Sequence, residues 1–137
     1  MQPAVAAPSC SVSSTTTVTF SSYDVFSASN DNSTGGGATI LCNGNTTAVM
    51  SLTKGSSGTY TARTMSGPGG VLLNYNLYTT AALTTVWGDG TGGTSTVSMS
   101  AIKNVAKAVT IYGLIPKNQY AAVAGAYTDT ITFSVTP

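Results

Sequence analysis

The sequence contains no histidine and no glutamate, which removes the residues that most enzymes use for acid–base chemistry. Its only side-chain carboxylates are Asp24, Asp31, Asp89 and Asp129. A Ser-His-Asp triad and a histidine-ligated zinc site are therefore impossible, and two cysteines cannot make a four-thiolate site. Ser51 and Ser100 each lie three residues before a lysine, but the companion motifs of the serine–lysine enzymes are absent. The sequence thus predicts a protein that is not an enzyme and uses no cofactor or metal.

Charge is also scarce. Charged residues make up 7% of the chain, against about 25% in an average domain. No run of lysine or arginine supplies the clustered cations that phosphate binding needs, so nucleic acid is not an expected partner. No apolar run is long enough to predict a transmembrane segment. Hydrophobic residues nevertheless reach 42% of the 137 residues, which is enough for the core of one domain.

What the chain does contain is alternation of apolar and polar residues, the period of a half-buried strand. The clearest case is segment 127–137, where Ile131, Phe133 and Val135 share one face and serine and threonine occupy the other. No later segment in the sequence follows to pair with this strand. It must therefore pair on both sides with earlier segments, or leave a gap in the sheet.

Similar alternation predicts further strands, separated by segments rich in Gly, Asn and Pro. The predicted strands span 10–20, 38–42, 48–52, 60–65, 71–78, 97–101 and 107–115. Segments 27–37 and 88–93 are predicted loops, and Asn43-Gly44 predicts a hairpin turn. Short strands at this spacing predict an all-β fold, an antiparallel β-sandwich.

Cys10 and Cys42 are each in phase with apolar neighbours, so both side chains can point inward. They could be two separate buried thiols or the two halves of a disulfide. The composition, rich in Ser and Thr and poor in charge, favours a disulfide in an extracytoplasmic protein. The small residues of 4–7 are similarly typical of a cleavage site for an export signal.

Two polar loops and one aromatic residue are candidates for a binding role. Asp31 and Asp89 could supply oxygen ligands to calcium, but Asn and Asp also favour turns for conformational reasons, and we prefer that interpretation. Trp87 could contact a ligand, but we expect it to pack in the core or at its rim.

Several motifs occur in an order that can be compared with known families. They are 10–13 (CSVS), 22–24 (SYD), Cys42, 63–67 (RTMSG), 73–78 (LNYNLY), 85–93 (TVWGDGTGG), 112–116 (YGLIP) and 127–130 (YTDT). As an ordered set they resemble the spore coat protein U domain family, whose relatives include subunits of archaic (Csu-type) chaperone–usher pili. The resemblance covers roughly residues 10–136.

This resemblance implies an immunoglobulin-like sandwich that lacks its last strand. Such subunits are secreted, held by a periplasmic chaperone and assembled at an outer-membrane usher, and an N-terminal extension of the next subunit fills the gap. The two cysteines match the positions of the family's disulfide. The expected groove for the donor strand is lined by Val12, Val18 and Phe20 from one strand and by Ile131, Phe133 and Val135 from the other.

The expected organisation is an N-terminal extension over 1–9 and one domain over 10–137. The extension departs from the family's pattern, because it contains two prolines and spans at most about 30 Å when extended. Pro3, Val5 and Ala7 form only a weak candidate donor segment. The sequence therefore predicts a strand acceptor on the cell surface or outside the cell. A spore-coat structural protein, or a pilus-tip adhesin that binds a surface or glycan through exposed loops, is the alternative.

Overall fold

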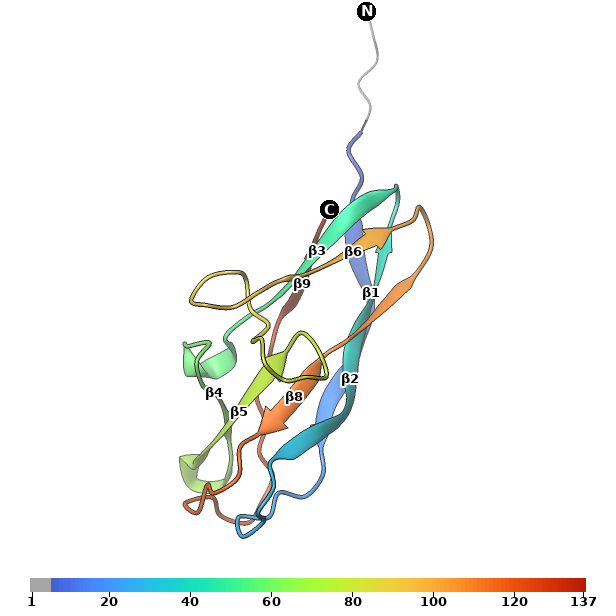
Figure 1. Ribbon diagram of the computed structural model, residues 1–137. Coiled ribbons are helices and arrows are strands. Elements are labelled where there is room, and N and C mark those ends of the chain that lie inside the picture. The colour runs from blue at the N-terminus through green and yellow to red at the C-terminus, as the bar shows by residue number, and fades with distance from the viewer. Residues whose placement is uncertain (1–5) are drawn as a thin grey trace, which may run out of the picture.

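The computed structural model describes residues 6–137, which form a β-sandwich of two antiparallel sheets (Figure 1). The larger sheet has the order β1 (Cys10–Phe20), β2 (Asp31–Cys42), β8 (Tyr112–Ile115), β5 (Leu72–Tyr78) and β4 (Arg63–Ser66), and β7 (Lys107–Thr110) also pairs with β2. The smaller sheet has the order β6 (Val97–Ala101), β3 (Thr46–Leu52) and β9 (Phe133–Thr136). Two single-turn 3-10 helices, η1 (Gly55–Ser57) and η2 (Pro68–Gly70), flank β4. The predicted all-β sandwich is confirmed.

The core lies between the two sheets and is made by the inward residues of the alternating strands. Ile40, Met50 and Leu52 are almost fully buried, as their parity predicts. Trp87 has no exposed surface, and its indole Nε1 donates to the backbone oxygen of Met50 at 3.0 Å. Its predicted role in packing is confirmed. Within the described residues, no helix has the length and apolar character needed to span a membrane.

The prediction of a loop over 27–37 is wrong for residues 31–37, which belong to β2. The reason is close packing of three strands around a glycine run. A Cβ on Gly36 would lie 2.5 Å from Val18 of β1, and a Cβ on Gly37 would lie 2.2 Å from the backbone oxygen of Val109 in β7. Glycine here permits a bulged strand with neighbours on both sides, rather than marking a turn.

The hairpin predicted at Asn43-Gly44 is also wrong. This turn connects β2 to β3, which lie in different sheets and do not pair with each other. The Asn43 side chain accepts from the Ser9 amide at 2.8 Å, and the Asn43 amide donates to the Ser9 oxygen at 3.0 Å. The turn therefore extends the β1–β2 ladder before the chain crosses to the second sheet.

The predicted strand over 107–115 is divided into β7 and β8. Ile111 interrupts it and donates its amide to the Gly36 oxygen at 3.1 Å. The predicted inward face is retained, because Ile111 and Ile115 are both buried. The split follows β2, which pairs with β7 through one part of its length and with β8 through another.

Candidate functional site: an open groove between two strands

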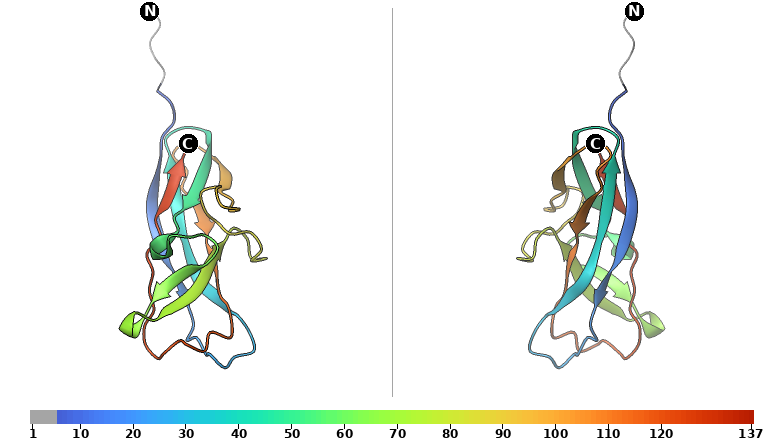
Figure 2. Two further views of the ribbon diagram at one scale, coloured as in Figure 1. Left: turned by 90° about the vertical axis from the view of Figure 1, so that its left-hand side faces the viewer. Right: turned by 90° about the vertical axis from the view of Figure 1, so that its right-hand side faces the viewer.

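Two edge strands face each other across one side of the sandwich. Among residues 6–137, β1 pairs only with β2, and β9 pairs only with β3. Figure 2 shows β9 beside the upper part of β1, and the two strands are in contact there, but no β-ladder joins them in the part of the chain that the structure describes. Each edge strand therefore presents backbone donors and acceptors that could pair with another strand.

Below this contact lies a cavity of about 1030 Å³. One wall is the lower half of β1 with the loop that follows it, over residues 15–26, and the other wall contains most of residues 122–133. The floor is the hydrophobic core itself, through Leu52, Met65, Leu73, Leu77, Ile111 and Ile115. Folded proteins rarely leave apolar space of this size unfilled. The cavity is thus an open groove whose floor is core surface.

Four of the six predicted groove residues line this cavity: Val18, Phe20, Ile131 and Phe133. Each of them is half-buried and packs against the core cluster. The Phe20 ring meets the edge of Tyr75 at 6.5 Å between centroids, and the Phe133 ring meets Trp87 at 6.0 Å. These aromatic contacts fix the two rings on opposite sides of the groove.

The other two predicted groove residues, Val12 and Val135, do not line the cavity. Both are half-buried and belong to the upper parts of β1 and β9, where these strands approach each other. The open part of the groove is therefore shorter than β1 and begins near Thr15.

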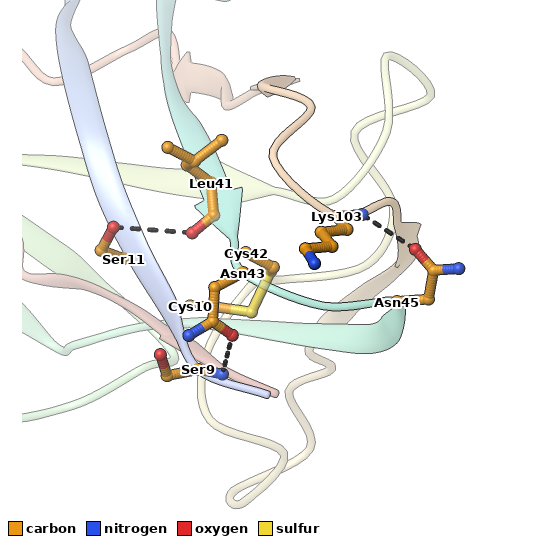
Figure 3. The surroundings of a disulfide bond; sticks show 8 residues. All are labelled: Ser9, Cys10, Ser11, Leu41, Cys42, Asn43, Asn45 and Lys103. Atoms are coloured by element: carbon orange, nitrogen blue, oxygen red, sulfur yellow. Dashed lines mark hydrogen bonds between the residues drawn. A yellow bond between two sulfur atoms is a disulfide. The ribbon is translucent and has the colours of Figure 1, made fainter. Parts of the chain in front are cut away.

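The upper end of β1 is fixed by a disulfide between Cys10 and Cys42 (Figure 3), as predicted. The two residues are directly opposite each other in the β1–β2 ladder, with Cα atoms 4.1 Å apart. Next to the bridge, Ser9 donates to the Asn43 side chain and Ser11 lies across from Leu41. The bridge ties β1 to its ladder partner β2.

The C-terminal segment forms less regular strand than its alternation predicts. Only Phe133–Thr136 is a strand, while residues 127–132 follow an irregular path along the groove. The predicted alternation is nevertheless present, since Ile131, Phe133 and Val135 are half-buried and their neighbours Thr130 and Thr132 are exposed.

The profile of the Spore Coat Protein U domain family matches residues 2–134, almost the whole chain. The chain belongs to the Spore Coat Protein U domain family. No curated protein sequence matches it significantly.

A solved structure shares the fold of this Spore Coat Protein U domain. It is the crystal structure of the CsuC–CsuE chaperone–tip adhesion subunit pre-assembly complex from archaic chaperone-usher Csu pili of Acinetobacter baumannii. The match has a TM-score of 0.59 and 23% sequence identity, and it covers 94% of this chain. This chain spans only 40% of the chain that it matches, so the likeness concerns the fold.

Of the three weak donor candidates, the structure of this Spore Coat Protein U domain describes only Ala7. Pro3 and Val5 are outside the described residues. Ala7 is exposed and does not line the cavity. In Figure 1 residues 6–9 run upward from the start of β1, along the axis of the sandwich.

A buried arginine behind the groove was not predicted from the sequence. Arg63 is completely buried and its guanidinium donates to the backbone oxygens of Thr53 at 2.8 Å and Trp87 at 2.7 Å, and to the Asn76 side chain at 2.8 Å. Burial lowers the pKa of Arg63, but arginine stays charged in proteins. Position 63 falls in a motif of the Spore Coat Protein U domain resemblance, yet only the structure reveals that its charge is buried and satisfied by carbonyl groups.

Tyr75 and Asp129 form a second polar contact at the floor of the groove. The Tyr75 hydroxyl donates to Asp129 Oδ2 at 2.5 Å. Burial, and then this hydrogen bond and the negative charge of Asp129, raise the pKa of Tyr75, so its proton stays in place at neutral pH. Within residues 6–137 no three His, Cys, Asp or Glu side chains are grouped as a metal site. The groove combines an apolar floor with Ser, Thr and Asp side chains along its walls.

Proposed function

We propose that this protein is a structural subunit of an extracellular fibre and that its groove accepts an extended strand from a neighbouring subunit. The observation that carries the proposal is the groove between the lower half of β1 and residues 122–133, together with the edge of β1 that no strand pairs with among the described residues. A strand placed there could pair with the free edge of β1 and lie against residues 122–133 of the opposite wall. Recognition by strand addition uses backbone hydrogen bonds for affinity and side-chain pockets for specificity.

The energetics favour an occupant with alternating apolar side chains. Burying one such side chain is worth ~1.5–3 kcal/mol. Three or four of them would contribute several kcal/mol, which is comparable to a small domain's whole stability of about 5–15 kcal/mol. The free subunit is accordingly expected to be only marginally stable and prone to pair with other chains through its open edges.

The proposed route of assembly follows from the family and from the exposed edges. A periplasmic chaperone would occupy the groove after secretion, and an outer-membrane usher would then exchange it for a neighbouring subunit's donor strand at the cell surface. In this scheme residues 10–137 are the acceptor domain and 1–9 are an extension. The role is structural rather than enzymatic, because the chain lacks the histidine and glutamate of common hydrolytic sites.

A tip adhesin is the second candidate, and a surface feature favours it. Phe26 and Tyr120 are 85% and 64% exposed, and their rings lie 6.4 Å apart in loops at the lower end of the molecule. Leu72 is also 56% exposed, while Leu83 and Val86 are half-buried. A spore-coat protein with the same acceptor groove is the remaining alternative. Loss of surface adhesion in Tyr120→Ser, with assembly intact, would support the adhesin, because Tyr120 does not line the groove.

The acceptor role can be tested by supplying a donor strand in the same chain. A flexible Gly/Ser linker after Pro137 would carry a segment that alternates valine and threonine, and the control would carry Gly/Ser of equal length. The donor should raise Tm by on the order of 10 °C, since each kcal/mol shifts Tm by a few degrees in a domain of this size. Phe133→Asp, which places a charge in the groove, should abolish the gain. Equal Tm values for donor and control fusions would refute the proposal.

A further inference from the structure

The segment that forms the far wall of the groove is attached to the body of the domain by contacts that point away from β1. Resting on the proposed acceptor function, we infer that residues 125–132, the wall segment, are held by Asp129 and closely packed glycines so that the groove stays open for a donor. Asp129, Tyr75 and Gly67 are then positioning residues for strand acceptance. In Figure 2 the wall segment runs up from the lower loops along the edge of the molecule to β9.

The backbone of the wall segment forms hydrogen bonds on the side opposite to β1. Thr128 and Ser66 of β4 exchange two backbone hydrogen bonds, at 2.9 and 3.1 Å. Further along, the Thr53 amide donates to the Thr132 oxygen at 3.1 Å, and the Thr132 amide donates to Thr53 Oγ1 at 3.0 Å. The segment is therefore anchored at two points to the strand and loop that lie away from β1.

Asp129 lies between these two anchor points and adds a third. Its Oδ1 accepts from the Ser56 amide at 3.1 Å and from the Ser56 hydroxyl at 2.8 Å, and its Oδ2 accepts from the Tyr75 hydroxyl at 2.5 Å. Hydrogen bonds to a carboxylate are stronger than those between neutral groups. One side chain thus joins the wall segment to η1 and to the centre of β5.

Glycines allow the wall segment to lie this close. A Cβ on Gly55 would be 2.3 Å from Asp129 Oδ2, and a Cβ on Gly67 would be 2.3 Å from the Tyr127 ring. Gly125, with φ of 140°, would place a Cβ 2.3 Å from Pro68. Each of these contacts requires the absence of a side chain, so the glycines let the segment lie against η1, β4 and η2.

The attachment opposes a competing structure in which the groove closes on itself. Tyr127, Ile131 and Phe133 are half-buried, and they face Val18 and Phe20 across the cavity. Closing the gap would bury this apolar surface and would pair the free edge of β1. The anchors keep the wall segment on the β4 side, so the apolar surface remains available for a donor strand.

The test compares the donor gain in wild type and in variants of the anchors. The donor gain is the difference in Tm between the Val/Thr fusion and the Gly/Ser fusion of the same variant. Gly67→Ala displaces the Tyr127 ring, and Tyr75→Phe removes one hydrogen bond to Asp129 with little change of shape. Both variants should reduce the donor gain by at least half. Ser134→Ala is the control, because this exposed side chain lies on β9 and does not line the groove.

The outcomes separate this inference from the proposed function. If wild type shows no donor gain, the acceptor function fails. If wild type shows the gain and both variants keep it, even with both fusions destabilised equally, the anchors are only structural and the inference is wrong. Amide hydrogen exchange provides a second readout, since self-closure should slow exchange at Val18 and Phe20 in unfused Gly67→Ala. Tyr75→Phe preserves the test if Gly67→Ala does not fold.

Discussion

Removal of the Cys10–Cys42 bridge should cost this domain a large fraction of its stability. The two cysteines are separated by 32 residues in sequence. The chain-entropy model assigns about 3.7 kcal/mol to closing a loop of that length in the unfolded chain. Replacing both cysteines by alanine also leaves a small void at the buried Cys42 position, which adds about 1 kcal/mol. The expected loss is therefore about 4–5 kcal/mol.

Urea denaturation measured by tryptophan fluorescence is the appropriate assay, because Trp87 lies in the core. The double alanine variant and the reduced wild type should both unfold at much lower urea than the oxidised wild type. The m value, the slope of the free energy of unfolding against urea concentration, should increase, since an unbridged unfolded chain exposes more surface. Ser11→Ala, an exposed change beside the bridge, should shift stability by less than about 0.5 kcal/mol. A loss below about 1 kcal/mol in the double variant would refute the reasoning.

Three further changes test the groove and its support. Arg63→Lys should lower the free energy of unfolding by at least about 2 kcal/mol in urea melts, because lysine cannot replace all the hydrogen bonds and would leave buried acceptors unpaired. A change no larger than the about ±0.5 kcal/mol usual for surface substitutions would contradict this. Folding raises the pKa of Tyr75, so the unfolded chain loses the phenol proton first and stability should fall above about pH 10, by up to about 1.4 kcal/mol per pH unit. Tyr75→Phe should lack this component, and identical alkaline slopes would argue against it. Phe133→Ala should reduce stability more in the donor fusion than in the Gly/Ser fusion, because a donor strand completes the burial of the ring. Equal losses of stability would show that the ring stays outside the interface with the donor.

The alternation of apolar and polar residues predicted the sandwich well, because burial of one face of each strand requires that alternation. Met50, Leu52 and Ile111 are buried as their parity requires, and the last segment keeps its inward face even where it is not a regular strand. The sequence pattern does not determine backbone pairing. Residues 127–132 alternate like a strand, yet their hydrogen bonds go to Ser66 and Thr53 rather than to β1.

Glycine and turn residues were the main source of error. The run 35–37 predicts a loop by composition, but two of these glycines admit the close approach of Val18 and Val109. Asn43-Gly44 is typical of hairpins, but here it carries the chain from one sheet to the other. Both errors arise because local conformational preference does not specify which distant strand packs against a residue.

The candidate groove was predicted in part. Ile131 and Phe133 were identified by parity, whereas the closed upper end at Val12 depends on how two distant strands approach. Arg63 and Asp129 were not assigned structural roles, since isolated charges in a sequence indicate exposed positions more often than buried ones.

The central claim is that β1 has a free edge that a donor strand fills. Amide hydrogen exchange, resolved by residue, measures this directly in the Val/Thr and Gly/Ser fusions. In an antiparallel edge strand, alternate amides point away from the neighbouring strand. We expect the outward amides of β1 between Thr15 and Phe20 to exchange rapidly in the Gly/Ser fusion and to become strongly protected in the Val/Thr fusion. Outward amides that are already protected without a donor, or that remain unprotected with one, would contradict the account.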